Sequence, residues 1–409
     1  MPKRAEQTLT PRLRFPEFIG QTLREVQLKD VTAESTTRNG DKLPITSVMG
    51  VRKAEGIVPM EERIIASDIA RYKIVQKEWF AYNPMRLNIG SIAQWKGEND
   101  ILVSPDYIVF KCLTDADSGI DPSYLNHFRQ SAAWENVVTE GGDGSVRVRI
   151  YYKDLARLYL ALPPFIEQQK LADCLTSLDE VIAAQGRKVA ALKAHKRGLM
   201  QQLFPREGET RPRLRFPEFR NALEWTVKKL SALIDLVSGI HLSPDQYSSS
   251  GDVPYFTGPS DFTNDMERVT KWATSSSNVA KKHDTLITVK GSGVGECWYL
   301  GMPSVAMGRQ LMAIRSETSS SQFIHQFLLT KRTRFEDLAS GNLIPGLARG
   351  DILDMVAPFP KKDEQQHIAD CLSSLDVQIA AESTQLAALK THKQGLMQQL
   401  FPSPESAAI

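Results

Sequence analysis

An eight-residue phrase, GLMQQLFP, occurs twice in this sequence of 409 residues, at 198–205 and again at 395–402. A second phrase, PRLRFPEF, begins at Pro11 and recurs at Pro212. Because a long internal repeat must fold twice in the same way, it constrains the architecture more strongly than any local motif does. The sequence therefore predicts two half-chains with the same framework, arranged as a pseudo-twofold internal repeat.

The similarity between the half-chains is uneven along their length. Residues 167–205 and 364–402 agree at 27 of 39 positions. By contrast, residues 30–140 and 230–337 align only at scattered points. A duplicated framework with divergent inserts indicates two domains that are held alike and recognise different targets.

Each strongly repeated region predicts a long helix with a single apolar stripe. Apolar residues recur alternately four and three positions apart, which is the a/d pattern of a coiled coil. In the first copy they are Leu171, Leu175, Leu178, Ile182, Val189, Leu192, Leu199 and Leu203. A helix of this length extends over about 50 Å, and its one apolar stripe needs a partner. We therefore expect the two repeated helices to pair with each other.

Polar residues interrupt both stripes at matching places, Gln185 and Lys196 in the first copy and Glu382 and Lys393 in the second. If the helices run antiparallel, Gln185 faces Lys393 and Lys196 faces Glu382. A parallel pairing would instead place the two lysines side by side, so polar layers would specify direction and register. The alternative is that both lysines extend to water and specify nothing.

The segments between the repeats contain short alternating or aromatic runs bounded by Gly, Asn and Asp, which predict strands and turns. The fold class is therefore predicted as α+β, with two divergent globular domains joined by two long helices that form an antiparallel coiled coil. The predicted divisions are a first domain at 1–160, a long helix at 161–206, a second domain at 207–357, a long helix at 358–403 and a tail at 404–409.

Composition limits the class of protein. A content of 42% hydrophobic and 24% charged residues is typical of a globular chain. No run of eighteen apolar residues occurs, so we expect a soluble cytoplasmic protein with no membrane partner. The four cysteines show no zinc-ligand spacing, and no metal is expected. Because the net charge is only +2, any nucleic-acid surface must be a local patch.

Two helices of about 50 Å would separate the divergent domains by one to two turns of duplex DNA. Polar and basic residues on predicted loops are the candidate DNA contacts, since Arg and Gln can pair with base edges and Lys and Ser suit phosphates. An ordinary solvated surface is the alternative for each one. The candidates are Arg86, Asn88, Ser91, Gln94, Lys96, Arg147 and Arg149 in the first domain, and Thr257, Lys290, Ser292, Arg309 and Gln310 in the second.

No catalytic constellation stands out. The segment VKGSGVGEC places Glu296 where the third glycine of a dinucleotide-binding loop would stand, and a strand pattern follows it. The segment YNPMR differs from the base-gripping motif of amino-methyltransferases at Met85 and Arg86, and no glycine-rich loop for a methyl donor accompanies it. We therefore expect no catalytic residues, and a free-standing methyltransferase is excluded.

The chain resembles the specificity (S) subunits of type I restriction-modification systems. The resemblance is carried by RLRFPEF at the start of each half, by LPPFIEQQKLADCL and DEQQHIADCL at the helix starts, by GLMQQLFP, and by VKGSGVG with GRQLMAIR. It implies a non-catalytic subunit with two target-recognition domains, each reading one half of a bipartite, gapped site in double-stranded DNA. A coiled-coil scaffold that binds no DNA is the alternative.

The same resemblance implies the partners. The helices would dock methylation subunits, of which two are expected, and restriction or motor subunits would join through the assembled complex. No cofactor is expected on this chain, because S-adenosylmethionine and ATP would be bound by those partner subunits. Exposed basic residues of the first helix, Arg187, Lys188, Lys193 and Arg197, would contact a methylation subunit, unless they form only a solvated face.

Overall fold

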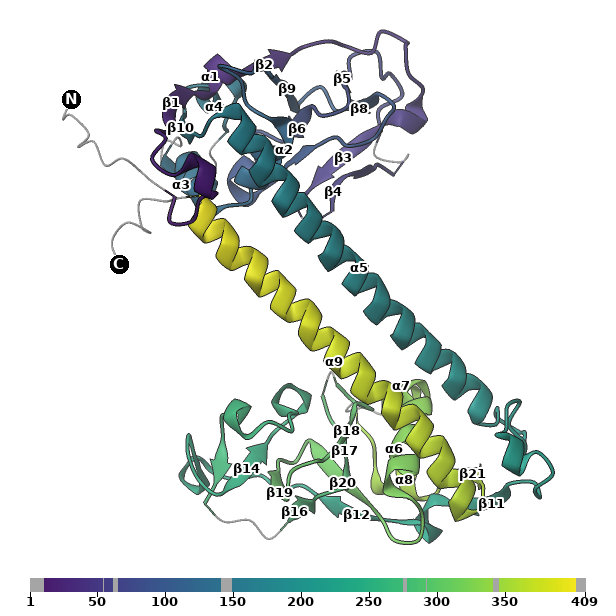
Figure 1. The fold of residues 1–409 in the computed structure, drawn as a ribbon. Helices are drawn as coiled ribbons and strands as arrows, with labels where there is room; N and C mark the ends of the chain where they lie inside the picture. The colour runs from purple at the N-terminus through teal and green to yellow at the C-terminus, as the bar shows by residue number, and fades with distance from the viewer. Residues whose placement is uncertain are drawn as a thin grey trace. The chain divides into compact units, whose positions relative to one another are not determined.

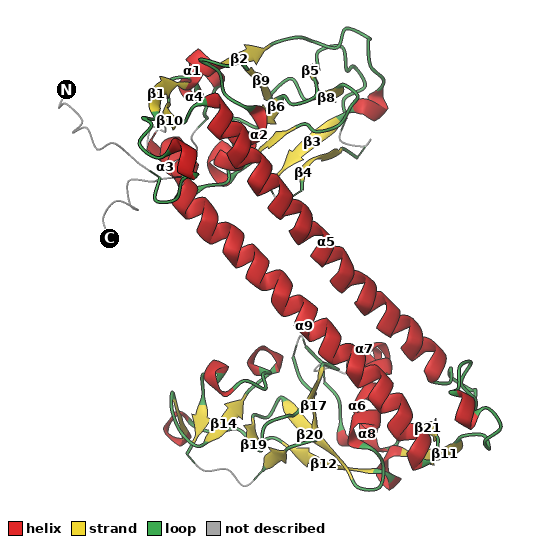
Figure 2. Cartoon of the chain, viewed as in Figure 1, coloured by secondary structure: helices red, strands yellow, loops and turns green. Residues whose placement is uncertain are grey.

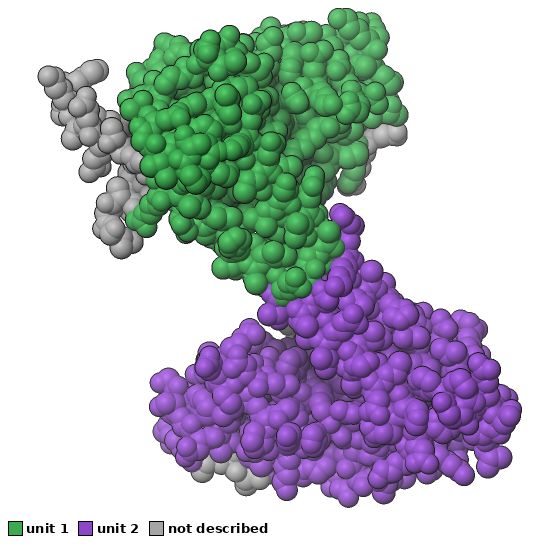
Figure 3. Space-filling model, in the orientation of Figure 1, with its two compact units in different colours: residues 1–185, 385–409 green, residues 186–384 purple. Residues whose placement is uncertain are grey.

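The computed structural model describes residues 11–53, 55–61, 65–140, 149–274, 278–291, 293–340 and 346–401. The chain divides into two compact units (Figure 3), residues 1–185 with 385–409 (unit 1) and residues 186–384 (unit 2). Both unit boundaries fall inside long helices, α5 (Phe165–Leu203) and α9 (Lys362–Leu400). Helices and strands are mixed in both units, as Figure 2 shows, so the predicted α+β class is confirmed.

Unit 1 is built on a four-stranded sheet with the order β2-β9-β6-β7 (Figure 1). Three two-stranded sheets, β1-β10, β3-β4 and β5-β8, accompany it. Its strands are β1 (Arg24–Gln27), β2 (Thr32–Ser35), β3 (Met49–Arg52), β4 (Gly56–Pro59), β5 (Lys73–Val75), β6 (Phe80–Tyr82), β7 (Ile92–Gln94), β8 (Ile101–Val103), β9 (Ile108–Cys112) and β10 (Tyr159–Leu162). The shorter helices are α1 (Leu28–Val31), α2 (Pro122–Phe128), α3 (Ala132–Glu140) and α4 (Tyr152–Leu155).

Unit 2 contains a four-stranded sheet of matching order, β12-β20-β17-β18, beside a five-stranded sheet, β13-β15-β14-β19-β16, and the pair β11-β21. Its strands are β11 (Thr226–Lys229), β12 (Ile234–Ser238), β13 (Tyr247–Ser248), β14 (Val253–Phe256), β15 (Trp272–Ala273), β16 (Val279–Lys281), β17 (Thr285–Thr288), β18 (Cys297–Tyr299), β19 (Ser304–Met307), β20 (Leu311–Ser316) and β21 (Val356–Phe359). The shorter helices are α6 (Ser321–Thr330), α7 (Arg332–Ser340) and α8 (Arg349–Leu353).

The central strands of the two four-stranded sheets are short and fully apolar in environment. Every residue of β6 and of β17 is buried. In unit 1 the rings of Phe80 and Phe110 stack with centroids 5.1 Å apart across β6 and β9. Helix α6 covers the corresponding sheet of unit 2 and contacts β17, β18 and β20. Burial of every residue explains why neither strand alternates between apolar and charged side chains, as a half-exposed strand does.

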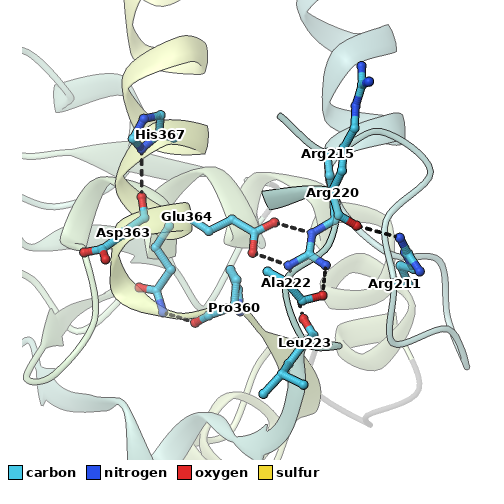
Figure 4. A network of polar contacts seen from close by, with 10 residues as sticks. Arg211, Arg215, Arg220, Ala222, Leu223, Pro360, Asp363, Glu364 and His367 are labelled. Atoms are coloured by element: carbon cyan, nitrogen blue, oxygen red, sulfur yellow. Dashed lines mark hydrogen bonds and ion pairs between the residues drawn. The ribbon is translucent and has the colours of Figure 1, made fainter. Parts of the chain in front are cut away.

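The repeated phrases at the start of each half and at the start of each long helix meet in the structure. In unit 2, the Arg215 guanidinium donates to both carboxylate oxygens of Glu364, at 2.8 and 2.6 Å (Figure 4). Arg14 and Glu167 form the same bidentate pair in unit 1, at 2.7 and 2.6 Å. All four side chains are at most 7% exposed. Bidentate charge-assisted bonds of this kind fix both distance and orientation.

The glutamine that follows each of these glutamates accepts a hydrogen bond from the residue that caps a short helix of the same unit. The Gln168 amide oxygen accepts from the backbone N–H of Asp121, the residue that caps α2, at 2.9 Å. Gln365 accepts in the same way from Ser320, which caps α6, at 3.0 Å. The repeated EQQ phrase is therefore structural: its glutamate anchors the N-terminal phrase, and its first glutamine anchors the domain.

The two copies of GLMQQLFP serve opposite halves of the chain. In unit 2, Phe204 packs on Phe323 and Trp225, with ring centroids 5.4 and 6.4 Å apart. In unit 1, Phe401 packs on Tyr124 and Phe128, at 5.6 Å in both cases. Each unit thus combines a helix start from one half-chain with a helix end from the other.

The predicted pairing of the seam residues is wrong. Lys393 donates to Asp179 at 2.6 Å in unit 1, and Lys196 donates to Asp376 at 2.6 Å in unit 2. Glu382 pairs with Lys188 at 2.5 Å, not with Lys196. The lysines do not meet the polar residues of the opposite stripe, because their long side chains reach aspartates beside it. Lys393 thus pairs with Asp179, where Gln185 was predicted.

The Asp179–Lys393 pair lies beside a buried histidine, and this predicts a dependence on pH. His127 is 2% exposed, its Nε2 lies 3.0 Å from the Thr176 hydroxyl, and burial lowers its pKa to about 4, assisted by the charge of Lys393. Since the unfolded pKa is higher, at about 6.5, the unfolded chain binds the proton more tightly. The stability of unit 1 should therefore fall as the pH drops from about 6.5 to 4, by up to about 3 kcal/mol.

Replacing His127 by Gln, the residue type that unit 2 has at the corresponding position of α6, should remove this contribution. Urea unfolding of the variant and the wild type at several pH values measures the difference. The exposed His392, substituted in the same way, is the control. An unchanged pH profile in the H127Q variant would contradict the prediction.

Candidate nucleic-acid interface

In unit 2, three loops that follow separate strands come together at one end of the sheets. The backbone N–H of Gly308, after β19, donates to Phe256 O at the end of β14, at 2.8 Å. The N–H of Val289, after β17, donates to Gln310 O at 2.7 Å. Four predicted contacts, Thr257, Lys290, Arg309 and Gln310, are thereby brought onto one loop cluster (the reading loops of unit 2).

Backbone packing in this cluster requires glycine. A Cβ built on Gly239 would lie 2.1 Å from the carbonyl oxygen of Gly308, so no side chain fits there. Gly291 has a φ of +92°, a conformation that residues with a Cβ rarely adopt. A Cβ on Gly258 would lie 3.2 Å from the side-chain oxygen of Gln310. The Gln310 side chain therefore lies close to a backbone that carries no side chain of its own.

The exposure of these four residues separates two roles. Lys290, Arg309 and Gln310 are exposed and available to a ligand. The Thr257 hydroxyl donates to Asp261 at 2.7 Å and accepts from Lys271 at 3.2 Å. Thr257 therefore stabilises the loop, which differs from its predicted role as a contact. Lys271, which the sequence pattern did not single out, joins this network because β15 lies beside β14.

In unit 1 the predicted contacts separate into exposed and buried residues. Arg86 and Asn88 lie exposed in the loop between β6 and β7, and Lys96 is exposed after β7. Ser91 and Gln94 are only 5% and 8% exposed, and the Ser91 hydroxyl donates to Val51 O at 3.3 Å. These two were predicted on a loop, but Gln94 belongs to β7 and Ser91 directly precedes it. Their side chains face the core, so their prediction as contacts is wrong.

Of the remaining candidates, one lies near the same loop and two lie outside the described residues. The N–H of Ile150 donates to Pro84 O at 3.0 Å, which places the exposed Arg149 next to the segment that carries Arg86. Arg147 and Ser292 lie outside the described residues.

Three further residues lie at this loop, two of them in it and one, Lys53, directly after β3. The Lys53 side chain lies over Gly90, where an added Cβ would meet its methylenes at 3.4 Å. Met85 and Ile89 are 57% and 54% exposed on either side of Arg86. Exposed apolar side chains beside a basic residue suit contact with base methyl groups or base steps. Their exposure is a property of the fold, and no sequence pattern indicated it.

The described residues contain no group of His, Cys, Asp and Glu arranged to hold a metal ion. None of the helices within the described ranges is both long and apolar enough to span a bilayer. The basic helix residues Arg187, Lys193 and Arg197 are exposed, whereas Lys188 forms the ion pair with Glu382. Together the duplicated framework, the matching sheets and the basic loops define a protein of two similar units, each of which carries exposed basic residues on loops of its own.

Comparison with known proteins gives the family. Residues 222–391 match the type I restriction modification DNA specificity domain. A putative type I restriction enzyme MjaX specificity subunit from Methanocaldococcus jannaschii is 24% identical over 399 residues, which cover 92% of this chain and 92% of that protein. Residues 222–391 therefore carry the specificity domain of that family, and the chain as a whole is similar to type I restriction enzyme specificity subunits.

Solved structures share the fold. The type I restriction-modification S subunit from M. genitalium aligns with a TM-score of 0.64 at 14% identity, covering 96% of this chain and 99% of its own. A chain from a study of complex assembly and conformational transition of the type I R-M system aligns with a TM-score of 0.54 at 21% identity, covering 93% and 97%.

Proposed function

We propose that this chain is the DNA-recognition subunit of a type I restriction-modification complex, in which each unit reads one half of a bipartite, gapped site in double-stranded DNA. The observation that carries the proposal is the repeated framework with divergent loops. Both units have the same Arg–Glu pair, the same glutamine that accepts from a helix-capping residue, and the same sheet order, while the exposed loop residues differ. A scaffold that binds only proteins gives no reason for divergence concentrated in basic loops.

The long helices would set the spacing between the two half-sites as an antiparallel coiled coil. Within unit 1, Asp179 in the first half of α5 pairs with Lys393 in the second half of α9, and within unit 2 Lys196 in the second half of α5 pairs with Asp376 in the first half of α9. Both pairings join the first half of one helix to the second half of the other. They support opposite helix directions within each unit.

The partners in this proposal are methylation and restriction subunits, and S-adenosylmethionine and ATP would be bound there and not by this chain. The subunit itself would be non-catalytic and would act by placing the partners on DNA. The exposed residues Arg187, Lys193 and Arg197 of α5 offer a basic surface for docking a methylation subunit.

An exchange of residues 220–357 for the matching segment of another specificity subunit tests the function. Because the framework residues flank this segment, the exchange should change one half-site of the methylated sequence and leave the other half and its spacing unchanged. Mapping methylated adenines in cells that carry the whole system gives the readout. If both half-sites changed together, the proposal that each unit reads one half-site would be wrong.

Within the reading loops of unit 2, single substitutions should separate base reading from phosphate binding. Replacing Gln310 by Ala should lower discrimination at one base pair by about 1–3 kcal/mol, because a glutamine amide can pair with a base edge. Replacing Lys290 by Gln should weaken binding to all sequences and reduce the salt dependence of the affinity. Binding to a randomised duplex pool by the assembled complex measures both. Identical effects of the two changes would contradict this division of roles.

A further inference from the structure

A basic pocket lies in unit 2, at the end of β17 and β20 that is opposite the reading loops. Its volume is about 300 Å³. Strand β17 runs from Thr285, beside this pocket, to Thr288, which leads to Lys290. Strand β20 runs in the other direction, from the Gln310 loop to Arg315 in the pocket wall. The pocket is therefore separated from the reading loops by the length of the sheet.

The lining of the pocket carries a net positive charge, and Asp235 and Glu317 outside the lining also interact with Arg315. Its walls carry Lys281, Lys282 and Arg315 against one carboxylate, Asp284, so three cations and one anion leave a charge of +2. Asp284 is 3% exposed and is held by Arg315 at 3.1 and 2.7 Å. It also accepts the backbone N–H of Lys281 at 2.8 Å. Asp284 is thus occupied by the pocket wall, and both lysine side chains are exposed.

A histidine and hydroxyl groups lie at the same pocket. His283 and Ser321 belong to its lining, and the Tyr299 hydroxyl lies 3.0 Å from His283 Nδ1 and 3.0 Å from the Ser321 hydroxyl. Ser321 begins α6, a helix of ten residues in which the Ser320 hydroxyl accepts the N–H of Phe323 at 3.4 Å. The N–H groups of the two residues before Phe323 have no acceptor within the helix. Such groups, together with the positive end of the helix dipole, favour an anion. The Ser319 side chain adds a further hydroxyl to the lining.

The corresponding turn in unit 1 is less basic: Lys77 matches Lys282, but Gln76 stands where unit 2 has Lys281. Glu78 and His283 both have left-handed backbones, with φ of 68° and 75°, two residues before the central strands β6 and β17. Unit 1 therefore carries a glutamate where unit 2 carries the histidine. The cap of α2 is Asp121, whereas the cap of α6 is Ser320. The turn that both units share therefore differs in charge between them. Its structural role, which is the same in both units, does not explain this difference.

We propose that this pocket binds a phosphate-class oxyanion. A phosphate group presents several acceptor oxygens and a charge that matches two lysines, hydroxyl groups and helix N–H groups. The phosphate could belong to the DNA backbone away from the bases read by the opposite loops, or to a free phosphate. In the first case the inference rests on the proposed function.

The test uses the full chain with both lysines replaced, K281Q/K282Q, and a second variant, H283N, because asparagine tolerates the left-handed backbone. The matched control is K228Q, which removes an exposed lysine of unit 2 outside the pocket. Titration calorimetry with inorganic phosphate at constant ionic strength forms the first arm. If the free anion is the ligand, the wild type and K228Q bind saturably, and the K281Q/K282Q variant binds at least tenfold more weakly.

The second arm measures the salt dependence of affinity for duplex DNA by the complex assembled with methylation subunits. If a backbone phosphate is the ligand, K281Q/K282Q reduces the slope of log affinity against log salt by about one per lost contact, with unchanged sequence preference. H283N weakens binding in whichever arm responds. The inference is overturned if neither arm distinguishes K281Q/K282Q from K228Q. Failure of the wild-type complex to prefer any DNA sequence would overturn the proposed function instead, and the phosphate arm alone would then decide.

Discussion

Replacing Phe204 by alanine is expected to destabilise the second recognition domain by about 3–5 kcal/mol and to leave the first unchanged. Phe204 belongs to the first half of the sequence, but its ring is buried in unit 2 among Phe323, Phe327 and Trp225. Removing it leaves a cavity in a core that cannot collapse around a rigid helix end. Hydrogen exchange of α6, compared with that of α2, measures the effect on each unit.

The reciprocal change provides the control. Phe401 stands at the matching position of the second copy and packs on Tyr124 and Phe128 in unit 1. Its replacement by alanine should accelerate exchange in α2 and spare α6. If F204A destabilised unit 1, or both units equally, the conclusion that each unit contains a helix end from the other half-chain would be wrong.

Replacing Glu364 by glutamine is expected to cost unit 2 about 3–5 kcal/mol, because it leaves the guanidinium of Arg215 buried without its counter-charge. The two side chains are each 4% exposed, and Arg215 also donates to Ala222 O and Leu223 O at 2.9 and 3.2 Å (Figure 4). The hydrogen bonds to Glu364 raise the pKa of Arg215, so the guanidinium stays charged. Urea unfolding, with hydrogen exchange of α6 as the report on unit 2, measures the loss.

Two further variants complete this test. The substitution E218Q changes an exposed glutamate in the same repeated phrase as Arg215, PRLRFPEF. It should leave the free energy of unfolding nearly unchanged. The double variant R215M/E364L should recover most of the stability, since a buried ion pair can be replaced by apolar side chains at little cost. A double variant as unstable as E364Q would show that the pair contributes more than mutual neutralisation.

Among the candidate contacts of unit 2, those on loops next to glycines are exposed, as a contact with DNA requires. Lys290, Arg309 and Gln310 come together because β17, β19 and β14 end at the same edge. Ser91 and Gln94 had the same composition around them, yet they lie in or beside a short strand whose side chains are all buried. A three-residue strand leaves too little periodicity to reveal which side chains face the core.

The seam of the long helices shows a second limit. Matching polar positions predicted pairs between Lys196 and Glu382, but Lys196 pairs with Asp376. A lysine side chain spans more than one helical turn, so many acidic residues lie within its reach, and sequence position alone does not choose among them. The choice depends on the axial register, which the packing at the helix ends sets.

The sequence by itself determined the duplicated framework, the two long helices and the α+β class. These follow from local periodicity and from the repetition that is visible in both half-chains. Only the tertiary structure decided which helix end enters which unit, which glutamate meets which arginine, and which polar residues of the loops are exposed. Those outcomes depend on contacts between residues about 150 to 200 positions apart, such as Arg215 with Glu364 and Lys196 with Asp376. Contacts at that separation are selected by the packing of whole domains, and no local pattern records them.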